Sequence, residues 1–337
     1  MVTMQDVADA AGVSKATVSY VVSGSPLISE KTASRVRAEM EKLGYSINHA
    51  ARVLSTSKTG AIGVLSSAEQ NASFSLSLSA YLYGIARAAG DMGYDTMLLA
   101  GADGASALKS AALTKRIDGA IILDVRNGDS RIRAAVQSGL PTVLLGDPED
   151  SMGLDSVDAD FEEISSTLVN YLYRYGHRDL IFIGWPKMTY ERRLNYAIRF
   201  RSAMVERAQA LGMKIHCIYP ENSMADLLRR LKRAVEEYGD ATAILIHNDA
   251  AVIEVSQAFL SLNIKIPEDF SVVAVIPDKV GVGMQIPFTA MNLDINAIVK
   301  RTVGTLVHRI ESPDGPARRV LVGQHLLLAD SVKRISR

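Results

Sequence analysis

Residues 3–22 have the sequence TMQDVADAAGVSKATVSYVV, and this stretch decides the fold of the N-terminal region. Thr3 and Asp6 have the spacing of a capping box, and apolar residues then recur at helical spacing. A glycine ends this first helix, and Ser14 is placed to cap a second one over residues 15–22. Two short helices joined by a turn that contains glycine predict a helix-turn-helix, which places its second helix in the major groove of DNA.

The residues that follow extend this unit. After a turn at residues 23–26, Ser29 can cap a third helix that runs to about Leu43, and Gly44 is its stop. Residues 48–55, NHAARVLS, can form one or two helical turns, and so short a helix is marginal in water. We therefore expect it to need DNA or a partner chain to hold it.

Length and charge bound the rest of the chain. The 337 residues exceed what one hydrophobic core serves, so we expect a small module and a larger body. The formal net charge is zero, and residues 1–60 hold seven Lys and Arg against five Asp and Glu. Any contact with DNA is therefore expected to be local and not to come from a broad basic coat.

Several classes of protein are not favoured by the composition. A single cysteine excludes an intrachain disulfide framework, and six histidines without paired spacing predict no metal site. No apolar run reaches the roughly 18 residues of a membrane span, and the N-terminus does not resemble an export signal. We expect a cytoplasmic protein that has no membrane partner and no cofactor.

From about residue 60 the pattern changes to short apolar strands that alternate with amphipathic helices such as 78–92 and 197–211. Strands are expected at 61–65, 96–100, 120–123, 142–145, 180–183, 214–218, 243–246 and 271–275. This alternation predicts an α/β body with parallel sheets covered on both faces. Ligands in such folds bind beyond the carboxyl ends of the strands, so we expect a pocket to be lined by the residues that follow each strand.

The order of the N-terminal motifs, with ISEKT at 28–32, LGY at 43–45 and NHAARVLS at 48–55, resembles the DNA-binding domain of the lactose-repressor (LacI/GalR) family of bacterial transcription regulators. Several body segments carry the same resemblance: RIDGAIIL at 116–123, YGHRDLIFIG at 175–184, FRSAM at 200–204, HNDAA at 247–251 and NIKIPEDFSVVAV at 263–275. The resemblance covers essentially the full chain.

The resemblance implies an all-α helix-turn-helix headpiece followed by a bilobed body like that of the periplasmic binding proteins, with two doubly wound parallel sheets. The implied domains are a DNA-binding domain at 1–47, a hinge helix and linker at 48–59, and an effector-binding and dimerisation domain at 60–337. Within the body, lobe 1 takes about 60–159 and 291–320, and lobe 2 takes about 160–290 and 321–337.

The resemblance also implies which residues contact DNA. Lys15, Ala16 and Tyr20 match positions that reach base edges, where lysine can donate to guanine and alanine can pack on a thymine methyl. Positions that match or neighbour phosphate contacts are Thr3, Ser14, Thr17, Ser19, Ser29 and Thr32, and those in the hinge helix are Asn48, Ala51 and Leu54. Leu54 matches the leucine that the family inserts into the minor groove, where an apolar wedge kinks the duplex.

Effector binding is the less specific part of the resemblance. The expected contact residues are Phe74, Asp124, Asp147, Trp185, Tyr190, Tyr196, Asn248, Asp249 and Ile276. Tyr196 stands where the family has a ligand-binding arginine, and Ile276 stands where it has a pocket aspartate. Two groups that grip sugars are therefore absent, and Asp249 has two interpretations, as a ligand contact or as the cap of the following helix.

The sequence thus predicts a homodimeric transcriptional regulator, a repressor, that binds a pseudopalindromic operator and changes its DNA affinity with a small-molecule effector in the cleft between the lobes. One alternative is a DNA-binding regulator whose degenerate pocket serves a protein partner. A solute-binding protein would lack the helix-turn-helix. An enzyme is not expected, because no phosphate-binding loop and no nucleophile motif occurs.

Overall fold

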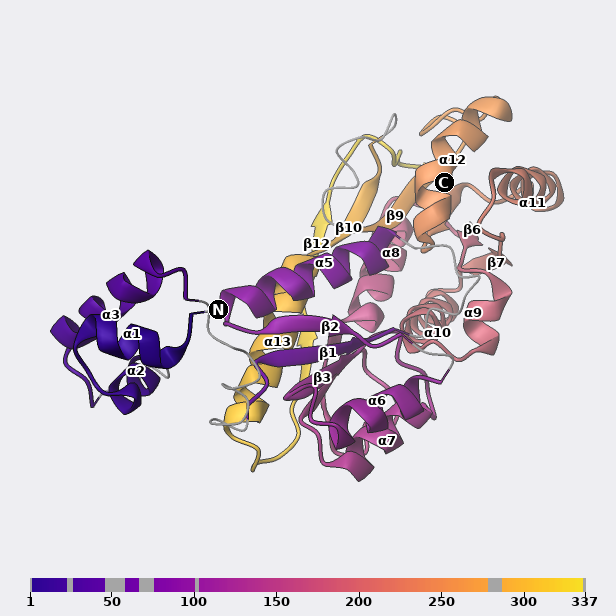
Figure 1. Cartoon of the computed structure of the whole chain (residues 1–337). Coiled ribbons are helices and arrows are strands. Elements are labelled where there is room, and N and C mark those ends of the chain that lie inside the picture. Colours follow the sequence, from indigo (N-terminus) through magenta and orange to yellow (C-terminus); the bar gives the residue numbers. More distant parts are fainter. Residues whose placement is uncertain are drawn as a thin grey trace. The chain divides into compact units, whose positions relative to one another are not determined.

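The computed structural model describes residues 2–22, 27–45, 58–66, 76–100, 103–277 and 287–335. The chain divides into two compact units, Met1–Thr59 and Gly60–Arg337. We call them the headpiece and the body and describe each by itself (Figure 1).

The described part of the headpiece contains helices α1 (Met4–Ala11), α2 (Lys15–Val22) and α3 (Glu30–Lys42). Thr3 and Asp6 form the predicted capping box, because the Thr3 side chain accepts a bond from the Asp6 N–H while the Asp6 carboxylate accepts one from the Thr3 N–H at 2.7 Å. Gly12 ends α1 at a φ of 62°, a left-handed conformation that glycine adopts without strain. The predicted helix-turn-helix is confirmed.

A small apolar core holds these helices together. Its buried members come from the inward faces of all three helices: Val7, Ala8, Ala11, Val18, Val21, Ala33 and Val36. Each helix alone is too short to be stable in water, so this shared core is what stabilises the unit. The outward faces are left to polar and small side chains.

The first lobe of the body is built on a parallel sheet with the strand order β11-β5-β4-β3-β1-β2. The strands are β1 (Ala61–Leu65), β2 (Asp95–Leu98), β3 (Gly119–Ile122), β4 (Thr142–Leu145), β5 (Asp155–Ala159) and β11 (Arg319–Val322). Helices α5 (Leu76–Asp91) and α13 (Ile295–Glu311) pack against each other over one face, and α6 (Gly104–Leu113) and α7 (Ser130–Ser138) pack over the other (Figure 1).

The second lobe repeats this plan with the strand order β12-β10-β9-β8-β6-β7. The strands are β6 (Asp179–Ile183), β7 (Lys214–Ile218), β8 (Ala243–Ile246), β9 (Ser271–Pro277), β10 (Thr289–Leu293) and the antiparallel β12 (His325–Leu327). Helices α8 (Phe161–Arg174) and α10 (Asn195–Ala210) cover one face, and α11 (Met224–Glu237) and α12 (Asp249–Ser261) cover the other, while the short α9 (Lys187–Glu191) precedes α10.

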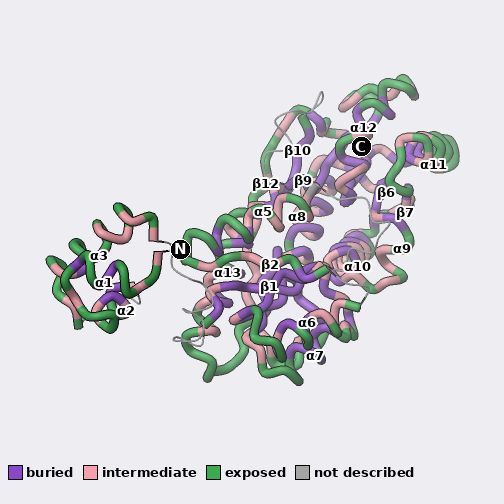
Figure 2. Tube along the Cα trace, viewed as in Figure 1, coloured by how far each residue is buried: buried purple, intermediate pink, exposed green. Residues whose placement is uncertain are grey.

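The strands lie inside and the helices outside, as the predicted doubly wound α/β class requires (Figure 2). One hydrophobic core runs from the α5 and α13 side of the first sheet to the α8 and α10 side of the second. In the described residues the chain crosses between the sheets after β5, after β10 and after β11, so the three implied crossings are present. The second crossing follows Leu293, slightly beyond the position of about 291 that the resemblance implies, because β10 pairs with β9 as far as that residue.

Four strands escape the sequence pattern: β5, β10, β11 and β12. In β5 the sequence is DSVDA, which is too polar to predict a buried strand, yet every residue of it is buried. Arg309 donates to the Asp155 carboxylate at 2.8 and 2.9 Å, and Arg199 donates to the Asp158 carboxylate at 2.7 Å. Because these two arginines come from distant helices, the pattern of local hydrophobicity contains no sign of them.

Candidate DNA-binding and ligand-binding sites

Helix α2 separates its buried and exposed residues cleanly. Val18 and Val21 are buried against the other helices, whereas Lys15, Ala16 and Tyr20 are exposed, and 46% of the Tyr20 surface is accessible. One long cation, one methyl and one phenol therefore project from the same helix that the sequence predicts to read DNA. These groups can donate to guanine, pack on thymine and bond or stack at a base edge.

Hydroxyl side chains fix the N-terminal ends of α2 and α3. The Ser14 hydroxyl accepts a bond from the Thr17 N–H at 3.1 Å and lies 2.9 Å from the Thr17 hydroxyl. Ser29 caps α3 by accepting from the Thr32 N–H, and their hydroxyls are 3.0 Å apart. Helix N-termini of this kind present free N–H groups and a positive dipole end, which is what a DNA phosphate binds.

The remaining residues that the sequence predicts to contact DNA lie in two groups. Thr3 caps α1 and is exposed, and Ser19 is half-buried on α2. Asn48, Ala51 and Leu54 lie outside the described residues. Within the described residues, the candidate DNA-binding surface of the headpiece consists of α2 and the capped N-terminal ends of α1 and α3.

The body contains a cavity of about 80 Å³ between its two lobes, which we call the inter-lobe cavity. It lies at the carboxyl ends of strands from both sheets, where a ligand is expected in a doubly wound fold. The described residues that line it are Ser77, Leu78, Tyr81, Leu123, Asp124, Val125, Leu145, Gly146, Asp158, Phe161, Trp185, Asn195, Tyr196, His247, Asp249, Val275 and Leu293.

Four of the expected effector residues meet in this cavity, namely Asp124, Trp185, Tyr196 and Asp249. Asp124 follows β3 at a φ of 51°, and its carboxylate accepts a bond from the Ser66 hydroxyl at 2.6 Å. Asp249 opens α12, and it accepts a bond from a backbone N–H of the other lobe, that of Ser77, at 3.1 Å. Phe74, another expected contact, lies outside the described residues.

Four expected effector residues do not line the inter-lobe cavity, namely Asn248, Tyr190, Ile276 and Asp147. Asn248 caps α12 instead, because its side chain accepts from the Ala251 N–H at 3.0 Å and donates to the Gly184 carbonyl at 2.9 Å. Of the Asn248 and Asp249 pair, the asparagine is therefore the helix cap and the aspartate faces the cavity.

Packing elsewhere in the second lobe keeps Ile276 and Tyr190 out of the inter-lobe cavity. Ile276 is buried among the apolar residues on the α11 and α12 side of the second sheet. Tyr190 packs edge-on against Tyr219, with ring centroids 5.1 Å apart, and the Arg201 guanidinium lies 4.2 Å from the Tyr190 ring centre. A residue that follows a strand therefore does not always line the cavity. Its side chain can pack instead against a neighbouring aromatic ring or against the face of the sheet.

Asp147 belongs to a network of charges beside the cavity. Arg199 donates to the carboxylates of Asp158 at 2.7 Å and Glu162 at 2.6 Å, and it lies 3.4 Å from Asp147. Arg319 adds two further bonds to Asp147, at 2.8 and 2.6 Å. Since Arg199 stands on α10 while Asp147 and Asp158 belong to the first lobe, this network ties the lobes together.

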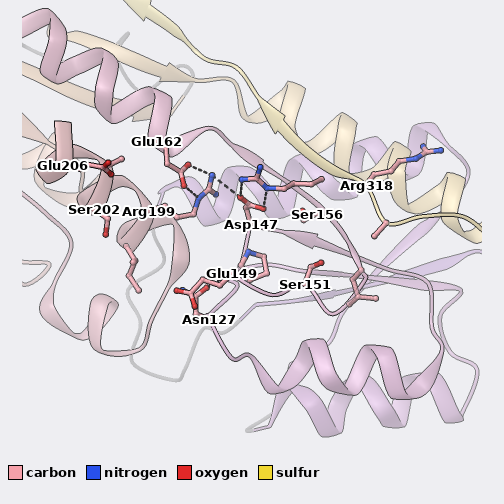
Figure 3. A pocket seen from close by; sticks show the side chains of 16 residues that line it. Asn127, Asp147, Glu149, Ser151, Ser156, Glu162, Arg199, Ser202, Glu206 and Arg318 are labelled. Atoms are coloured by element: carbon pink, nitrogen blue, oxygen red, sulfur yellow. Dashed lines mark hydrogen bonds and ion pairs between the residues drawn. The ribbon is translucent and has the colours of Figure 1, made fainter. Parts of the chain in front are cut away.

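The network forms one wall of a wider groove of about 730 Å³ (Figure 3). In Figure 3 the Arg199 guanidinium lies between Glu162 and Asp147, while Arg318 extends away from them. Lysine is absent from the described lining, and the arginines Arg199 and Arg319 are already paired with carboxylates. The described lining of this groove holds four carboxylates and three arginines, so its acids are largely matched by cations, unlike those of the inter-lobe cavity.

Backbone bonds also join the lobes at the edge of the cavity. The Asn195 N–H donates to the Val125 carbonyl at 3.1 Å, and the Asn127 N–H donates to the Arg193 carbonyl at 3.2 Å. Together with the bond from Ser77 to Asp249 they hold the lobes closed over the cavity. Such contacts break if the lobes separate, so they can couple occupancy of the cavity to the arrangement of the lobes.

Burial perturbs the ionisable groups of the cavity. It lowers the pKa of His247 to about 3, so the ring is neutral, and it raises the pKa of Tyr196 well above its ordinary value. Burial also raises the pKa of Asp249, and it raises the pKa of Asp158 to about 7 against the opposing pull of Arg199.

Sequence reasoning passed over four chemically important lining residues: Tyr81, Asp158, Phe161 and Asn195. His247 directly follows β8, and the rule that strand-end residues line the pocket predicts its place correctly. Asp158 lies in the unpredicted strand β5, and Asn195 starts a helix that crosses toward the other lobe, so no local signal marks either of them.

Comparison with known proteins agrees with both units. The family described as "Bacterial regulatory proteins, lacI family" matches residues 3–48, and a "Periplasmic binding protein-like domain" matches residues 169–332. Catabolite control protein A of Priestia megaterium is 27% identical over 283 residues, 81% of each chain. The ribose operon repressor of Escherichia coli K12 is 27% identical over 325 residues, 93% of this chain and 94% of that one.

Solved structures share the fold. The lac repressor dimer bound to operator and the anti-inducer ONPF has a TM-score of 0.79 at 23% identity and covers 98% of this chain and 99% of that one. The complex of the transcriptional regulator CelR with cellobiose has a TM-score of 0.69 at 21% identity, with 98% and 100% covered. No helix in the described part of the chain is long and apolar enough to cross a membrane. The chain therefore has a DNA-binding domain of the lacI family of bacterial regulatory proteins, followed by a periplasmic-binding-protein-like domain.

Proposed function

We propose that this chain is a sequence-specific transcriptional repressor that binds a pseudopalindromic operator as a homodimer and changes its DNA affinity when a small molecule occupies the inter-lobe cavity. The observation that carries the proposal is the outward face of α2, where Lys15, Ala16 and Tyr20 are exposed on a helix whose start is fixed by hydroxyl caps. The function is binding and not catalysis, and its place is the bacterial cytoplasm, where chromosomal DNA lies.

An exposed apolar face supports the homodimer. Tyr83 on α5, Leu98 at the end of the edge strand β2, and Ile253 and Leu260 on α12 are between 53% and 74% exposed. Helices α5 and α12 contact each other across the two lobes, so exposed apolar side chains of both lobes stand on contacting elements. Large exposed apolar patches mark interaction surfaces, and a two-fold dimer would cover the same patch on each copy.

Two copies are also needed for affinity. The formal net charge of the chain is zero, so one headpiece lacks the broad positive surface that binds DNA without sequence preference. A pair of headpieces about one helical turn apart would instead add two sets of local contacts, which is why the operator should be a pseudopalindrome.

The hinge proposed for residues 48–59 would connect the effector to the DNA. Leu54 is the expected wedge in the minor groove, and the small Ala51 would let two hinge helices approach each other. We propose domain bounds of 1–47 for the headpiece and 60–337 for the body, so that a change in the arrangement of the lobes alters the spacing of the two hinges.

The test is selection of duplexes from a random pool by the full chain at a fixed salt concentration. We expect enrichment of two inverted half-sites, with specific binding at least about a thousandfold tighter than binding to random DNA. Leu54→Ala should reduce DNA bending and specific affinity while the thermal unfolding of the protein stays the same. Equal binding to all sequences would contradict the proposed function, and unchanged bending by the variant would contradict the wedge.

A further inference from the structure

The inter-lobe cavity collects negative charge without a matching cation. Asp124, Asp158 and Asp249 line it, and none of its described lining residues is a lysine or an arginine. Two guanidinium groups lie beside the cavity, and both are already paired. Asp158 shares Arg199 with Glu162 and Asp147, and Arg131, which donates to the Asp124 carbonyl at 3.0 Å, is paired with Asp129 at 2.7 Å. Within the described residues, Asp124 and Asp249 receive only neutral donors, the Ser66 hydroxyl and the Ser77 N–H.

The described residues that line the cavity do not supply the missing positive charge. Residues 67–75, which follow β1, contain one glutamate and no lysine or arginine, and residues 278–286, which follow β9, contain one aspartate and one lysine, so neither segment carries a net positive charge. Among the residues that the structure describes, no group of three or more His, Cys, Asp and Glu side chains is placed to hold a metal ion. Carboxylates that are shielded from water are normally paired with a cation, and within the described residues Asp124 and Asp249 have none.

Three polar nitrogens of the same cavity have no hydrogen-bond partner among the described residues. They are Trp185 Nε1, Asn195 Nδ2 and His247 Nδ1, and all three atoms are buried. Asn195 and His247 are only 1% and 4% exposed, so water from outside does not serve them. Leaving a buried polar group unpaired costs about 1 to 3 kcal/mol, which indicates that a ligand completes these bonds.

Aromatic rings form the rest of the wall. The Trp185 and Tyr196 rings meet at 76° with centroids 5.4 Å apart, and Trp185 and His247 meet at 87° with centroids 5.9 Å apart. Tyr196 and His247 meet at 84°, so these three rings are nearly perpendicular to one another, like the faces of a box corner. Aromatic cages of this shape bind organic cations through the negative faces of their rings.

Resting on the function proposed above, we propose that the effector of the inter-lobe cavity is a small hydroxylated amine, such as an amino sugar or an amino alcohol, and not a neutral sugar. Its ammonium group lies against Asp124 and Asp249 within the aromatic walls. Its hydroxyl oxygens accept hydrogen bonds from Trp185 Nε1 and Asn195 Nδ2, and the neutral His247 takes a further bond.

The ionisation of the groups around the cavity agrees with this assignment. Burial raises the pKa of Asp249, and burial followed by the fields of Asp158, Asp249 and Asp124 raises the pKa of Tyr81. All three carboxylates therefore act on one phenol. A cation in the same space would stabilise the ionised carboxylates, whereas a neutral sugar would leave their mutual repulsion in place.

The experiment compares matched pairs that differ by an amine in place of a hydroxyl: glucosamine with glucose, galactosamine with galactose, and 2-aminoethanol with ethylene glycol. The full chain is titrated with each compound by calorimetry and thermal shift. We expect at least one amine to bind at least about tenfold more tightly than its neutral partner. Equal or tighter binding of the neutral partners, or no binding of any amine, would overturn the proposal.

Two variants with the same charge change locate the effect. Asp249→Asn should bring the preference for the amine down to about twofold or less, because the shape is kept and only the charge is lost. Asp240→Asn is the control, since Asp240 is exposed and precedes β8, while Asp249 follows that strand at its other end. An unchanged amine preference in Asp249→Asn would also contradict the assignment.

Binding of the same preparation to selected operator DNA separates this proposal from the function on which it rests. Intact specific DNA binding without any preference for amines refutes the effector class alone. Loss of specific DNA binding by the parent chain refutes the proposed function, whatever the amines do.

Discussion

The outward face of α2 and the inter-lobe cavity use polar groups in opposite ways. On α2, Lys15 and Tyr20 are close in sequence and exposed to water. In the cavity, Asp124 comes from the first lobe and is half-buried, whereas Asn195 and His247 come from the second lobe and are buried. An exposed polar group forms hydrogen bonds with water when no ligand is bound, so it does not destabilise the protein. A buried polar group destabilises the protein until it has a hydrogen-bond partner. The headpiece is therefore a site defined by one helix, and the cavity is a site defined by the whole body.

The largest expected effect concerns the charges that hold the lobes together. Arg199→Met should lower the free energy of unfolding of the body by about 3 kcal/mol, because it leaves the buried Asp158 without its cation, although protonation of Asp158 recovers part of the loss. Chemical denaturation followed by Trp185 fluorescence measures this.

Arg193→Met is the matched control, because Arg193 is 59% exposed and lies 3.9 Å from an exposed glutamate. It should change the free energy of unfolding by less than about 1 kcal/mol. A similar loss in both variants would show that burial of the Arg199 network has no energetic weight.

Acid should destabilise the body through its buried histidines and leave the headpiece unaffected by this route. The pKa of His247 is about 3 in the folded body, below the value of about 6.5 expected when unfolded. Its contribution to stability is therefore complete above pH 6.5 and is lost as the pH falls toward 3, by about 3 kcal/mol at pH 4. The described part of the headpiece contains no histidine.

The measurement is the free energy of unfolding between pH 7 and pH 4 for the parent chain and for His247→Gln. The variant should show a shallower acid loss. Asp158, whose raised pKa of about 7 acts in the opposite direction, contributes equally to both proteins and cancels in the difference. His325→Gln, at an exposed position, should keep the parent slope. Identical slopes for all three proteins would exclude His247 as the cause.

Base recognition should be lost without loss of stability. Lys15→Ala or Tyr20→Ala should reduce discrimination at the affected base pairs by ~1 to 3 kcal/mol, because these side chains are exposed and support no core. Binding titrations against operators with single base changes measure the effect. If the variants weaken binding equally on every sequence, these residues contact only phosphate.

The smallest expected effect is on a helix cap. Ser29→Ala should destabilise the headpiece by about 1 kcal/mol, because it removes the acceptor of the Thr32 N–H, and it should leave the unfolding of the body unchanged. Hydrogen exchange of α3 and of the body sheets, measured on the full chain, separates the two units. Faster exchange in both would show that their stabilities are coupled.

Prediction succeeded where the determining residues are neighbours. The helix bounds of α1 and α2, their caps and the split between buried and exposed faces of α2 all follow from contiguous residues, and the apolar strands of the body follow from their local composition. It failed for β5, whose aspartates are buried because of arginines far along the chain. The sequence-based prediction also assigned Asn248 to the ligand, although the Asn248 side chain caps the N-terminus of α12.

The sequence by itself therefore determined the headpiece, the α/β class of the body and the family, because helix caps, apolar periodicity and motif order are local properties. Only the tertiary structure decided which strand-end residues face a common cavity, which carboxylates have a cation and which nitrogens are left unpaired. Those properties depend on burial and on distances between residues from different lobes, and the free energy of a buried polar group is set by the partners that the fold brings to it.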